Sequence, residues 1–197
     1  MNTRFLAHRG VEVQRFFERE KLCVFVSLCA KILLVTIAFF FVSCDDESDD
    51  FPRTEVRFTC SLQQSPYNFI TTPGQFLTVT KKGSAYVVEY PGQPSYTDGK
   101  QGVFLGFGGL ILGQPVLSMD VSSQYAAYDR ACPAEAADLT ISRLTINTQR
   151  EATCPKCGTV YDLDTGFPKK GSGKRRLKTY TVYITNTATG KGLTVRN

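Results

Sequence analysis

Residues 154–166 read Cys154-Pro155-Lys156-Cys157-Gly158-Thr159-Val160-Tyr161-Asp162-Leu163-Asp164-Thr165-Gly166. A shorter motif, Cys132-Pro133-Ala134, lies upstream, and nineteen residues separate Ala134 from Cys154. The Asp-Leu-Asp-Thr-Gly part is typical of a turn in which the aspartates bond to nearby backbone groups. Asp162 and Asp164 can also be interpreted as a carboxylate pair, but the turn is the interpretation that we favour.

These motifs resemble the cluster-binding region of the Rieske [2Fe–2S] family. That family has Cys-x-His, a gap of about this length, and then Cys-x-x-His-Gly with a Tyr/Phe-Asp-x-x-Thr-Gly hairpin. Cys132 and Cys154 match the family cysteines, whereas Ala134 and Cys157 stand where the family has histidines. A Rieske centre places two thiolates on one iron and two imidazoles on the other. The resemblance therefore implies a Rieske-like fold without the ligands of an ordinary cluster.

The likeness extends from residue 124 to about residue 185. Gln124–Ala131 resembles the strand that leads into the first cysteine. Phe167-Pro168, the Gly171-Ser172-Gly173 loop and Leu177–Val182 resemble the third loop and the exit strand of the family. In this family the cluster-binding region is a small subdomain inserted into a larger domain of β-strands. The resemblance therefore implies such a subdomain at about residues 131–173.

The pattern of short β-type runs separated by Gly, Pro, Asn or Asp predicts an all-β fold. Residues 55–197 are long enough for one domain with its own core. We expect a Rieske-like β-sandwich or small barrel with the cysteine-containing subdomain inserted. The expected strands are Glu55–Cys60, Gln75–Thr80, Tyr86–Tyr90, Val103–Phe107, Leu110–Leu112, Val116–Val121, Tyr125–Arg130, Leu139–Thr145, Val160–Asp162, Leu177–Thr185 and Gly192–Arg196, with a hairpin turn at Thr187–Gly190.

The N-terminal part predicts an export signal. The apolar run Ile32–Val42 follows Lys31 and is followed directly by Ser43-Cys44. A run of this length suits the core of a signal peptide and is too short to span a bilayer as a helix. A small residue before Cys is how a lipoprotein signal ends, so we expect residues 1–43 to be a signal peptide and Cys44 to be lipidated. The alternative is a membrane anchor from Val24 to Val42.

An acidic run, Asp45-Asp46-Glu47-Ser48-Asp49-Asp50, comes next. Such a run stays solvated, so residues 44–54 are predicted to be the lipidated cysteine and an acidic tether. The run resembles the export signal of Bacteroidetes surface lipoproteins. We therefore expect an outer-membrane lipoprotein that faces the periplasm or the cell surface. An Asp after the lipidated cysteine retains lipoproteins at the inner membrane in enteric bacteria, which is the competing interpretation. The stretch before Lys31 is long for a signal peptide and indicates a translation start further downstream.

Removal of the predicted signal peptide changes the charge argument. The whole chain has a formal net charge of +5, but the part from Asp45 onward carries 17 Lys and Arg against 15 Asp and Glu. A nucleic-acid partner therefore loses its support, and the expected attachments are the membrane, through the lipid, and a protein of the envelope. The single histidine, His8, lies in the predicted signal peptide. The mature chain thus has no histidine for a general base, a Ser-His-Asp triad, a haem or an ordinary Rieske cluster.

The resemblance implies that the sulfurs of Cys132 and Cys154 face one position. Metal–sulfur bonds of about 2.3 Å would place these sulfurs roughly 3.5–4 Å apart, a small adjustment from the disulfide bond of about 2.05 Å. Exported cysteine pairs tend to oxidise, so we expect a disulfide that stabilises the domain by about 3 kcal/mol. Cys60 and Cys157 are the other disulfide candidates.

Cys157 has three further interpretations. It could ligate a second iron, for which Ala134 offers nothing and only Cys60 could supply the missing ligand. With Cys154 it could form half of a zinc site, completed by Cys60 and Cys132. Cys154 and Cys157 could also be a redox pair, without the helix N-terminus that normally activates one. Each of these interpretations lacks a component, so we expect no cofactor, with [2Fe–2S] as the alternative.

Two Gly-rich segments are weaker candidates. The segment Lys169–Arg176 is the strongest basic cluster, and its Gly-Ser-Gly-Lys core lacks the upstream Gly and the following helix of a phosphate-binding loop. We interpret it as a solvated loop, with weak binding of an anionic glycan, lipid or partner as a hypothesis. Gly106-Phe107-Gly108-Gly109 is interpreted as a turn.

The sequence therefore favours a lipid-anchored envelope protein with a Rieske-like fold that acts as a structural or binding module. The alternative is an electron-transfer protein in which Cys132, Cys154 and Cys157 hold an atypical [2Fe–2S] centre of low potential. A zinc-stabilised domain is the third hypothesis. No catalytic residue is predicted.

Overall fold

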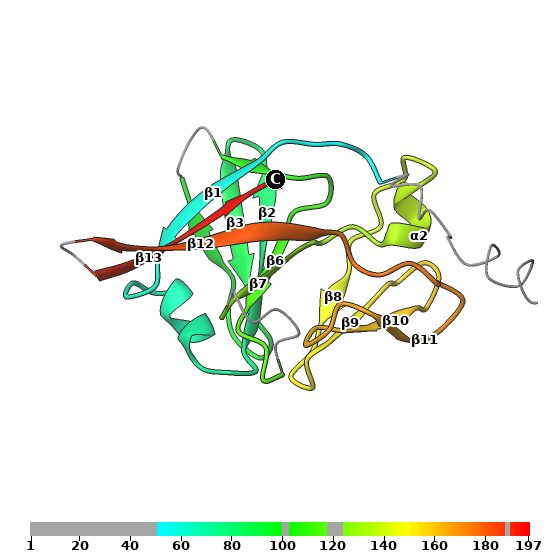
Figure 1. The fold of residues 1–197 in the computed structure, drawn as a ribbon. Helices are drawn as coiled ribbons and strands as arrows, with labels where there is room; N and C mark the ends of the chain where they lie inside the picture. Colours follow the sequence, from blue (N-terminus) through cyan, green and yellow to red (C-terminus); the bar gives the residue numbers. More distant parts are fainter. Residues whose placement is uncertain (1–50, 100–102, 118–123, 188–189) are drawn as a thin grey trace, which may run out of the picture. The chain divides into compact units, whose positions relative to one another are not determined.

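The computed structural model describes residues 51–197 except 100–102, 118–123 and 188–189. The predicted signal peptide, Cys44 and most of the predicted tether lie outside this part. Within it the protein is all-β, with one large antiparallel sheet, a smaller second sheet and one short α-helix (Figure 1). No helix in the described ranges is long and apolar enough to cross a membrane.

The large sheet has the strand order β4-β3-β2-β6-β7-β12-β13-β1-β5. Consecutive hairpins give β2–β3 and β3–β4 their pairing, whereas β1 pairs with the C-terminal strand β13, for example Phe58 with Val195. The bounds are β1 Val56–Ser61, β2 Phe76–Lys82, β3 Ala85–Glu89, β4 Tyr96–Asp98, β5 Phe104–Leu105, β6 Leu110–Gly113, β7 Ala126–Asp129, β12 Thr179–Thr187 and β13 Gly190–Arg196, with a 3₁₀ helix at Tyr67–Thr71.

The large sheet curves around a common core. In β1 every second side chain is buried, as expected for a strand with one face on a core. Phe58 of β1 packs edge-to-face against Tyr86 of β3, with ring centroids 5.9 Å apart, although several strands separate β1 from β3 in the sheet order. Val79, Leu112 and Leu193 belong to the same core. Burial of this apolar surface is the main stabilising contribution to such a fold.

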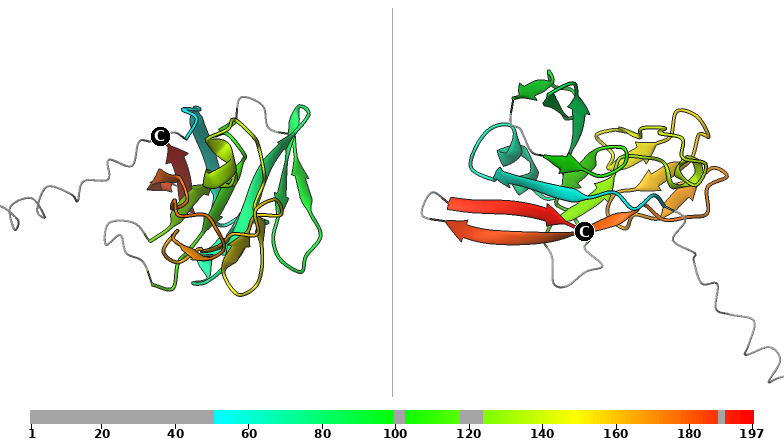
Figure 2. Two further views of the ribbon diagram at one scale, coloured as in Figure 1. Left: turned by 90° about the vertical axis from the view of Figure 1, so that its right-hand side faces the viewer. Right: turned by 90° about the horizontal axis from the view of Figure 1, so that it is seen from above.

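The second sheet is built entirely from the segment between β7 and β12. Its strand order is β11-β10-β9-β8, with β8 at Thr145–Ile146, β9 at Glu151–Thr153, β10 at Val160–Asp162 and β11 at Pro168–Lys170. Helix α2 (Pro133–Ala136) precedes it. Because β7 and β12 pair with each other, this insertion (residues 130–178) leaves and re-enters the large sheet at one place. It lies at the end of the large sheet where β12 begins (Figure 2). The predicted subdomain at about 131–173 falls within it.

A second apolar core joins the insertion to the large sheet. Phe76, Ile111 and Tyr128 contribute from the large sheet. From the insertion come Cys132, Leu144, Ala152, Cys154, Tyr161, Leu163 and Leu177. The cysteines of the insertion thus lie in a different core from Cys60, which is buried within the large sheet. This separation limits which thiols can act together.

Asp129, the last residue of β7, is fully buried and accepts four hydrogen bonds. The donors are the backbone N–H groups of Phe107, Gly108 and Ala131, at 2.8, 2.9 and 2.7 Å, and the Tyr180 hydroxyl at 2.7 Å. Burial raises the pKa of the Asp129 carboxyl, and these four donors oppose the rise. The carboxyl group therefore fixes the turn at residues 106–109, which confirms the predicted turn, against the strand that leads to Cys132.

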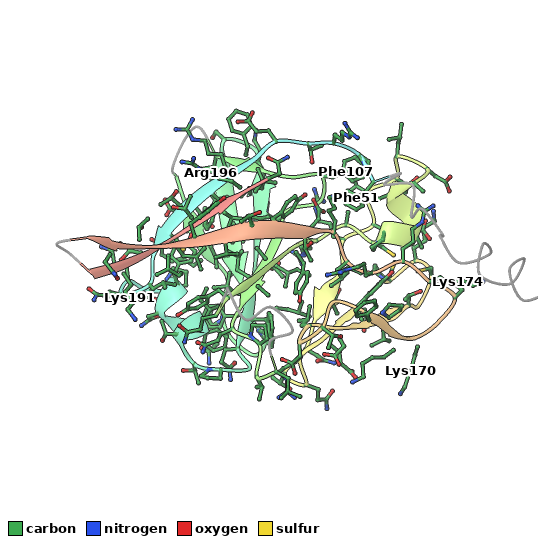
Figure 3. All side chains as sticks on the ribbon, viewed as in Figure 1. Phe51, Phe107, Lys170, Lys174, Lys191 and Arg196 are labelled. Atoms are coloured by element: carbon green, nitrogen blue, oxygen red, sulfur yellow. The ribbon has the colours of Figure 1, made fainter. Side chains whose placement is uncertain are left out.

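The folded part begins before the predicted domain start at residue 55. Phe51 is buried and packs edge-to-face on Phe107, with ring centroids 6.0 Å apart (Figure 3). Ala131 and Ala136 complete this small cluster beside α2. The acidic residues before it place residue 51 in the predicted tether. Its aromatic ring is nevertheless buried against Phe107, which fixes the chain at this residue.

Two expected strands differ from the structure. Of Leu139–Thr145 only Thr145 belongs to a strand, β8, and Arg143 forms an isolated bridge with Ala131. Leu139 ends the turn after α2, where its φ is +55° and its side chain is 73% exposed. Backbone bonds from Leu139 to Ala136 and from Thr140 to Glu135 hold that turn. Of Val116–Val121, residues 116 and 117 form a bend and the rest lies outside the described ranges. In Leu139–Thr145 and at residues 116 and 117 the side chains favour a strand, but tertiary contacts decide the backbone.

Candidate functional site

Three thiols meet at the junction of α2 with the second sheet. The sulfur atoms of Cys132, Cys154 and Cys157 all lie within 4.8 Å of one another. The Cys132–Cys157 separation is 3.6 Å, which exceeds a disulfide bond of about 2.05 Å. Cys132 and Cys154 are 0% and 1% exposed, and Cys157 is half-buried. The structure therefore brings together the three cysteines of the two motifs, and the predicted disulfide stays a prediction.

The backbone explains why these sulfurs converge. Cys132 caps the N-terminus of α2 directly after the strand that Asp129 fixes. Cys154 follows β9, and the tight connection to β10 is closed by bonds from Cys154 N to Thr159 O (2.9 Å) and from Gly158 N to Cys154 O (3.0 Å). Gly158 has φ of +70°, which glycine adopts without steric cost. The connection therefore turns Cys157 back toward Cys154.

Each of the three sulfurs has one hydroxyl group beside it. The Tyr161 hydroxyl lies 3.6 Å from the Cys132 sulfur. The Ser142 hydroxyl lies 3.3 Å from the Cys154 sulfur, and the Thr159 hydroxyl lies 3.2 Å from the Cys157 sulfur. The Cys157 backbone N–H also donates to the Cys154 sulfur at 3.5 Å. The Cys157 thiol donates to the Thr159 oxygen. In the thiolate state a sulfur only accepts hydrogen bonds, so the Tyr161 and Ser142 hydroxyls and the Cys157 N–H can stabilise a negatively charged site.

The protonation of the thiols differs because their surroundings differ. Burial raises the pKa of Cys132 to about 12, although Tyr161 and the Ala134 backbone N–H oppose it. Burial also acts to raise the pKa of Cys154, but the Cys157 backbone N–H, the Ser142 hydroxyl and the Lys156 backbone N–H together lower it below its ordinary value. Burial, followed by the bond to Cys132, raises the pKa of Tyr161, so its hydroxyl keeps its hydrogen. Cys154 is thus favoured over Cys132 as the thiolate.

The Gly171–Gly173 loop packs onto Thr159. Gly173 N donates to the Thr159 hydroxyl at 3.0 Å. A Cβ on Gly171 would lie 2.6 Å from Thr159 Cα, so only glycine allows this approach. The Thr159 oxygen thus accepts hydrogen bonds from both Gly173 N and the Cys157 thiol, which ties the loop to the site. This loop therefore serves the thiol site, whereas Lys170 and Lys174 point away into solvent (Figure 3).

The remaining predicted positions lie as follows. Ala134 is in α2 and packs against the second core with a methyl group, which offers no ligand atom. Cys60 lies in the core of the large sheet, among Tyr67, Tyr86 and Tyr125, and is not one of the grouped sulfurs. Within the part of the chain that the structure describes, the site thus offers three sulfur ligands.

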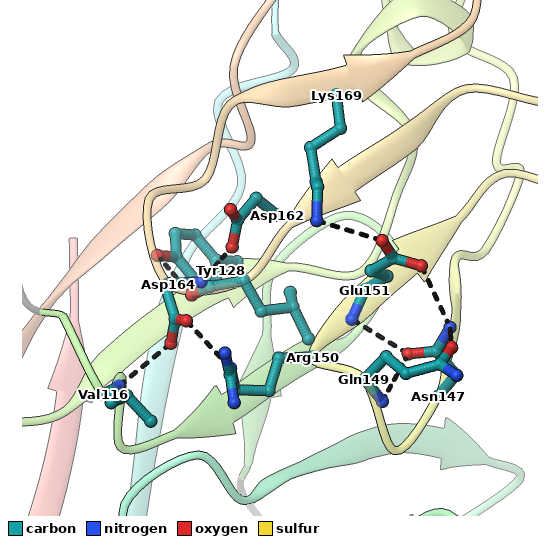
Figure 4. A network of polar contacts seen from close by, with 10 residues as sticks. Val116, Tyr128, Asn147, Gln149, Arg150, Glu151, Asp162, Asp164 and Lys169 are labelled. Carbon is teal, nitrogen blue, oxygen red and sulfur yellow. Dashed lines mark hydrogen bonds and ion pairs between the residues drawn. The ribbon is translucent and has the colours of Figure 1, made fainter.

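The two aspartates of the second motif have structural roles, which confirms the predicted turn. Asp162 Oδ1 accepts a hydrogen bond from Asp164 N at 2.9 Å. Asp164 is buried, accepts from Val116 N at 2.9 Å and pairs with Arg150 Nε at 2.8 Å (Figure 4). On the other side of this network Glu151 pairs with Lys169 at 3.0 Å. These contacts fix the hairpin that carries Tyr161.

The hydroxyl residues of the site are not evident in the sequence. Thr159 directly precedes β10 and Tyr161 is its middle residue, a spacing of two that places both on one face of an extended chain. Ser142 has no such signal, because it reaches Cys154 only through the turn after α2.

No family model and no curated protein matches the chain.

Proposed function

We propose that the chain is a lipid-anchored envelope protein whose Rieske-like domain is a structural or binding module and holds no ordinary [2Fe–2S] cluster. The observation that carries this proposal is the ligand set of the site. Three sulfurs converge, and the position of the first expected histidine is Ala134, whose methyl group packs in the core. An ordinary Rieske centre needs two cysteines and two histidines, so the residues present do not fit it.

Analysis of bound iron and sulfide tests this proposal. The full chain, exported by its own N-terminal segment and purified in detergent, is expected to lack visible absorption and acid-labile sulfide. When it is isolated aerobically, a mass deficit of two hydrogens would indicate the predicted disulfide within the thiol group. Two irons and two sulfides per chain would contradict the proposal.

The same measurement separates the second candidate, an electron carrier with an atypical centre. What favours this candidate is that three sulfurs converge and that hydroxyl and N–H donors surround them. It requires a fourth ligand for two irons, which the described residues do not bring to the site. A cluster with three or four thiolates would carry more negative charge than a His-ligated one and have a lower potential.

The membrane attachment is tested independently of the site. Metabolic labelling with a radioactive fatty acid is expected to mark the full chain, and Cys44→Ala is expected to abolish the label. The matched control is Cys29→Ala, which removes a cysteine within the predicted signal peptide and should leave the label in place. Label that survives Cys44→Ala would show that the protein is not lipidated at this residue. Protease treatment of intact cells then distinguishes the cell surface from the periplasm.

A further inference from the structure

We propose that Cys132, Cys154 and Cys157 bind a single Cu(I) ion in a three-coordinate thiolate site. This goes beyond the module function above and does not depend on the lipid anchor. The thiols are the ligands, and the Tyr161, Ser142 and Thr159 hydroxyls are positioning groups. Four lines of observation support the site: the spacing of the sulfurs, the number of ligands, the compensation of charge and the burial.

The spacing of the sulfurs suits one ion. A planar three-coordinate ion with metal–sulfur bonds of about 2.3 Å holds neighbouring sulfurs about 4 Å apart. The three sulfurs of the site lie within 4.8 Å of one another, and one pair is at 3.6 Å. Small rotations of the side chains would therefore bring all three sulfurs to bonding distance, because the hairpin and α2 already hold the backbone in place.

The number and type of ligands favour Cu(I). Soft thiolates select Cu(I), zinc and iron–sulfur centres. Structural zinc sites are almost always tetrahedral with four N or S ligands. Among the described residues the group contains three cysteines and no carboxylate or histidine, and Cys60 belongs to the other core. Three sulfurs without a fourth donor suit an ion that accepts three-coordination.

Charge compensation comes from neutral donors. Three thiolates and one Cu(I) carry a net charge of −2, which is costly to bury without hydrogen bonds. The Tyr161 hydroxyl beside Cys132, and the Ser142 hydroxyl and the Cys157 backbone N–H beside Cys154, can donate to the sulfurs and reduce this cost. Binding breaks three S–H bonds, forms three S–Cu bonds and releases three protons to solvent. The copper enters and stays as Cu(I), so no electron is transferred.

Burial provides both protection and a route of entry. Cys132 and Cys154 are closed to solvent, while Cys157 is half-buried at the edge of the site. An ion would bind first to Cys157 and then pass inward to the other two sulfurs. Because a disulfide between any two of the three would remove ligands, the reduced chain is the form that binds.

The test is an anaerobic titration of the reduced full chain with Cu(I) against a chromogenic chelator. The wild-type chain is expected to take one equivalent, with the ultraviolet absorption of a copper–thiolate bond. Cys132→Ser, Cys154→Ser and Cys157→Ser should each weaken binding about 100-fold or more. Cys60→Ser is the matched control in the other core and should bind as the wild type does.

A hydroxyl variant keeps the proposal testable if a cysteine variant fails to fold. Thr159→Val preserves the shape and removes the hydroxyl that contacts the Cys157 sulfur, so Cu(I) affinity should fall about 10- to 100-fold, the usual effect of losing a group that supports a metal ligand. Thr59→Val, which loses a hydroxyl that contacts Thr194 in the large sheet, should leave affinity unchanged. Circular dichroism establishes that each variant is folded.

X-ray absorption of the copper-loaded chain decides the geometry. Three sulfur neighbours at one distance are expected. Four ligands, more than one copper per chain, a preference for four-coordinate Zn²⁺, or Cu(I) affinity that no cysteine variant changes would overturn the proposal. These outcomes differ from the two irons and sulfides that would contradict the module function, so the two proposals fail separately.

Discussion

Asp129→Ala is expected to lower the free energy of unfolding by about 3 kcal/mol or more, one of the two largest effects that we predict. The physical reason is that the variant leaves the buried N–H groups of Phe107, Gly108 and Ala131 without their acceptor. A buried donor without a partner costs about 1–3 kcal/mol. Equilibrium urea unfolding of the full chain, followed by near-ultraviolet circular dichroism, measures the loss.

A graded series sharpens this prediction. Asp129→Asn keeps one carbonyl oxygen, so it should lose about 2 kcal/mol, chiefly through the Phe107 N–H. Tyr180→Phe removes only the hydroxyl bond to Asp129 and should lose about 1 kcal/mol. Asp138→Ala, at an exposed aspartate, is the matched control and should stay within about 0.5 kcal/mol of the wild type. Equal stability of the two Asp129 variants and the wild type would show that the four bonds do not hold the turn.

Gly171→Ala is expected to lower the free energy of unfolding by about 3 kcal/mol and to expose Cys157. Gly171 has φ of +101°, and a Cβ there would lie 2.6 Å from Thr159 Cα, a backbone atom that cannot rotate away. The loop must therefore move off Thr159, which breaks the bond from Gly173 N to the Thr159 hydroxyl. The rate of Cys157 alkylation, read by mass spectrometry, should rise in parallel.

Gly83→Ala is a control that introduces the backbone strain of a positive φ without a steric clash of the new Cβ. Gly83 also has a positive φ, +65°, but no atom lies within 4 Å of the position of its Cβ. This control should therefore lose only about 1 kcal/mol, the cost of a left-handed conformation for an ordinary residue. If both variants lose the same free energy and Cys157 reacts equally fast in both, the Gly171 loop does not cover the site.

A strand could be predicted where the pattern of its own residues indicates it, and not where contacts distant in sequence determine it. The alternation of Val56, Phe58 and Cys60 identifies β1 because the strand has one face on the core. Strand β11 was missed because it begins at Pro168, and a Pro is compatible with a strand only at an edge such as this one. The expected strand at Leu139–Thr145 is confirmed only at its end, because Leu139 belongs to the turn after α2 and β8 begins at Thr145.

The sequence predicted the three cysteines of the site but not the residues that contact their sulfurs. The resemblance of the two motifs to the Rieske pattern singled out Cys132, Cys154 and Cys157, and the structure brings their sulfurs together. Ser142 and the Gly171–Gly173 loop reach the sulfurs through tertiary packing, which a spacing along the chain does not encode. The positions of Ala134 and Cys60 relative to the thiols likewise depend on which of the two cores each residue joins.

The pairing of β7 with β12 has a consequence for how such a protein can change over time. Tyr128 pairs with Thr179 and Ala127 pairs with Tyr180, so both ends of the insertion are fixed to neighbouring strands. The base sheet therefore constrains where residues 130–178 start and finish, but not which side chains they carry between those points. Residues of the insertion can be exchanged one at a time while the register of the base strands is inherited unchanged. A lineage can in this way replace the chemistry of the insertion and retain the architecture that presents it.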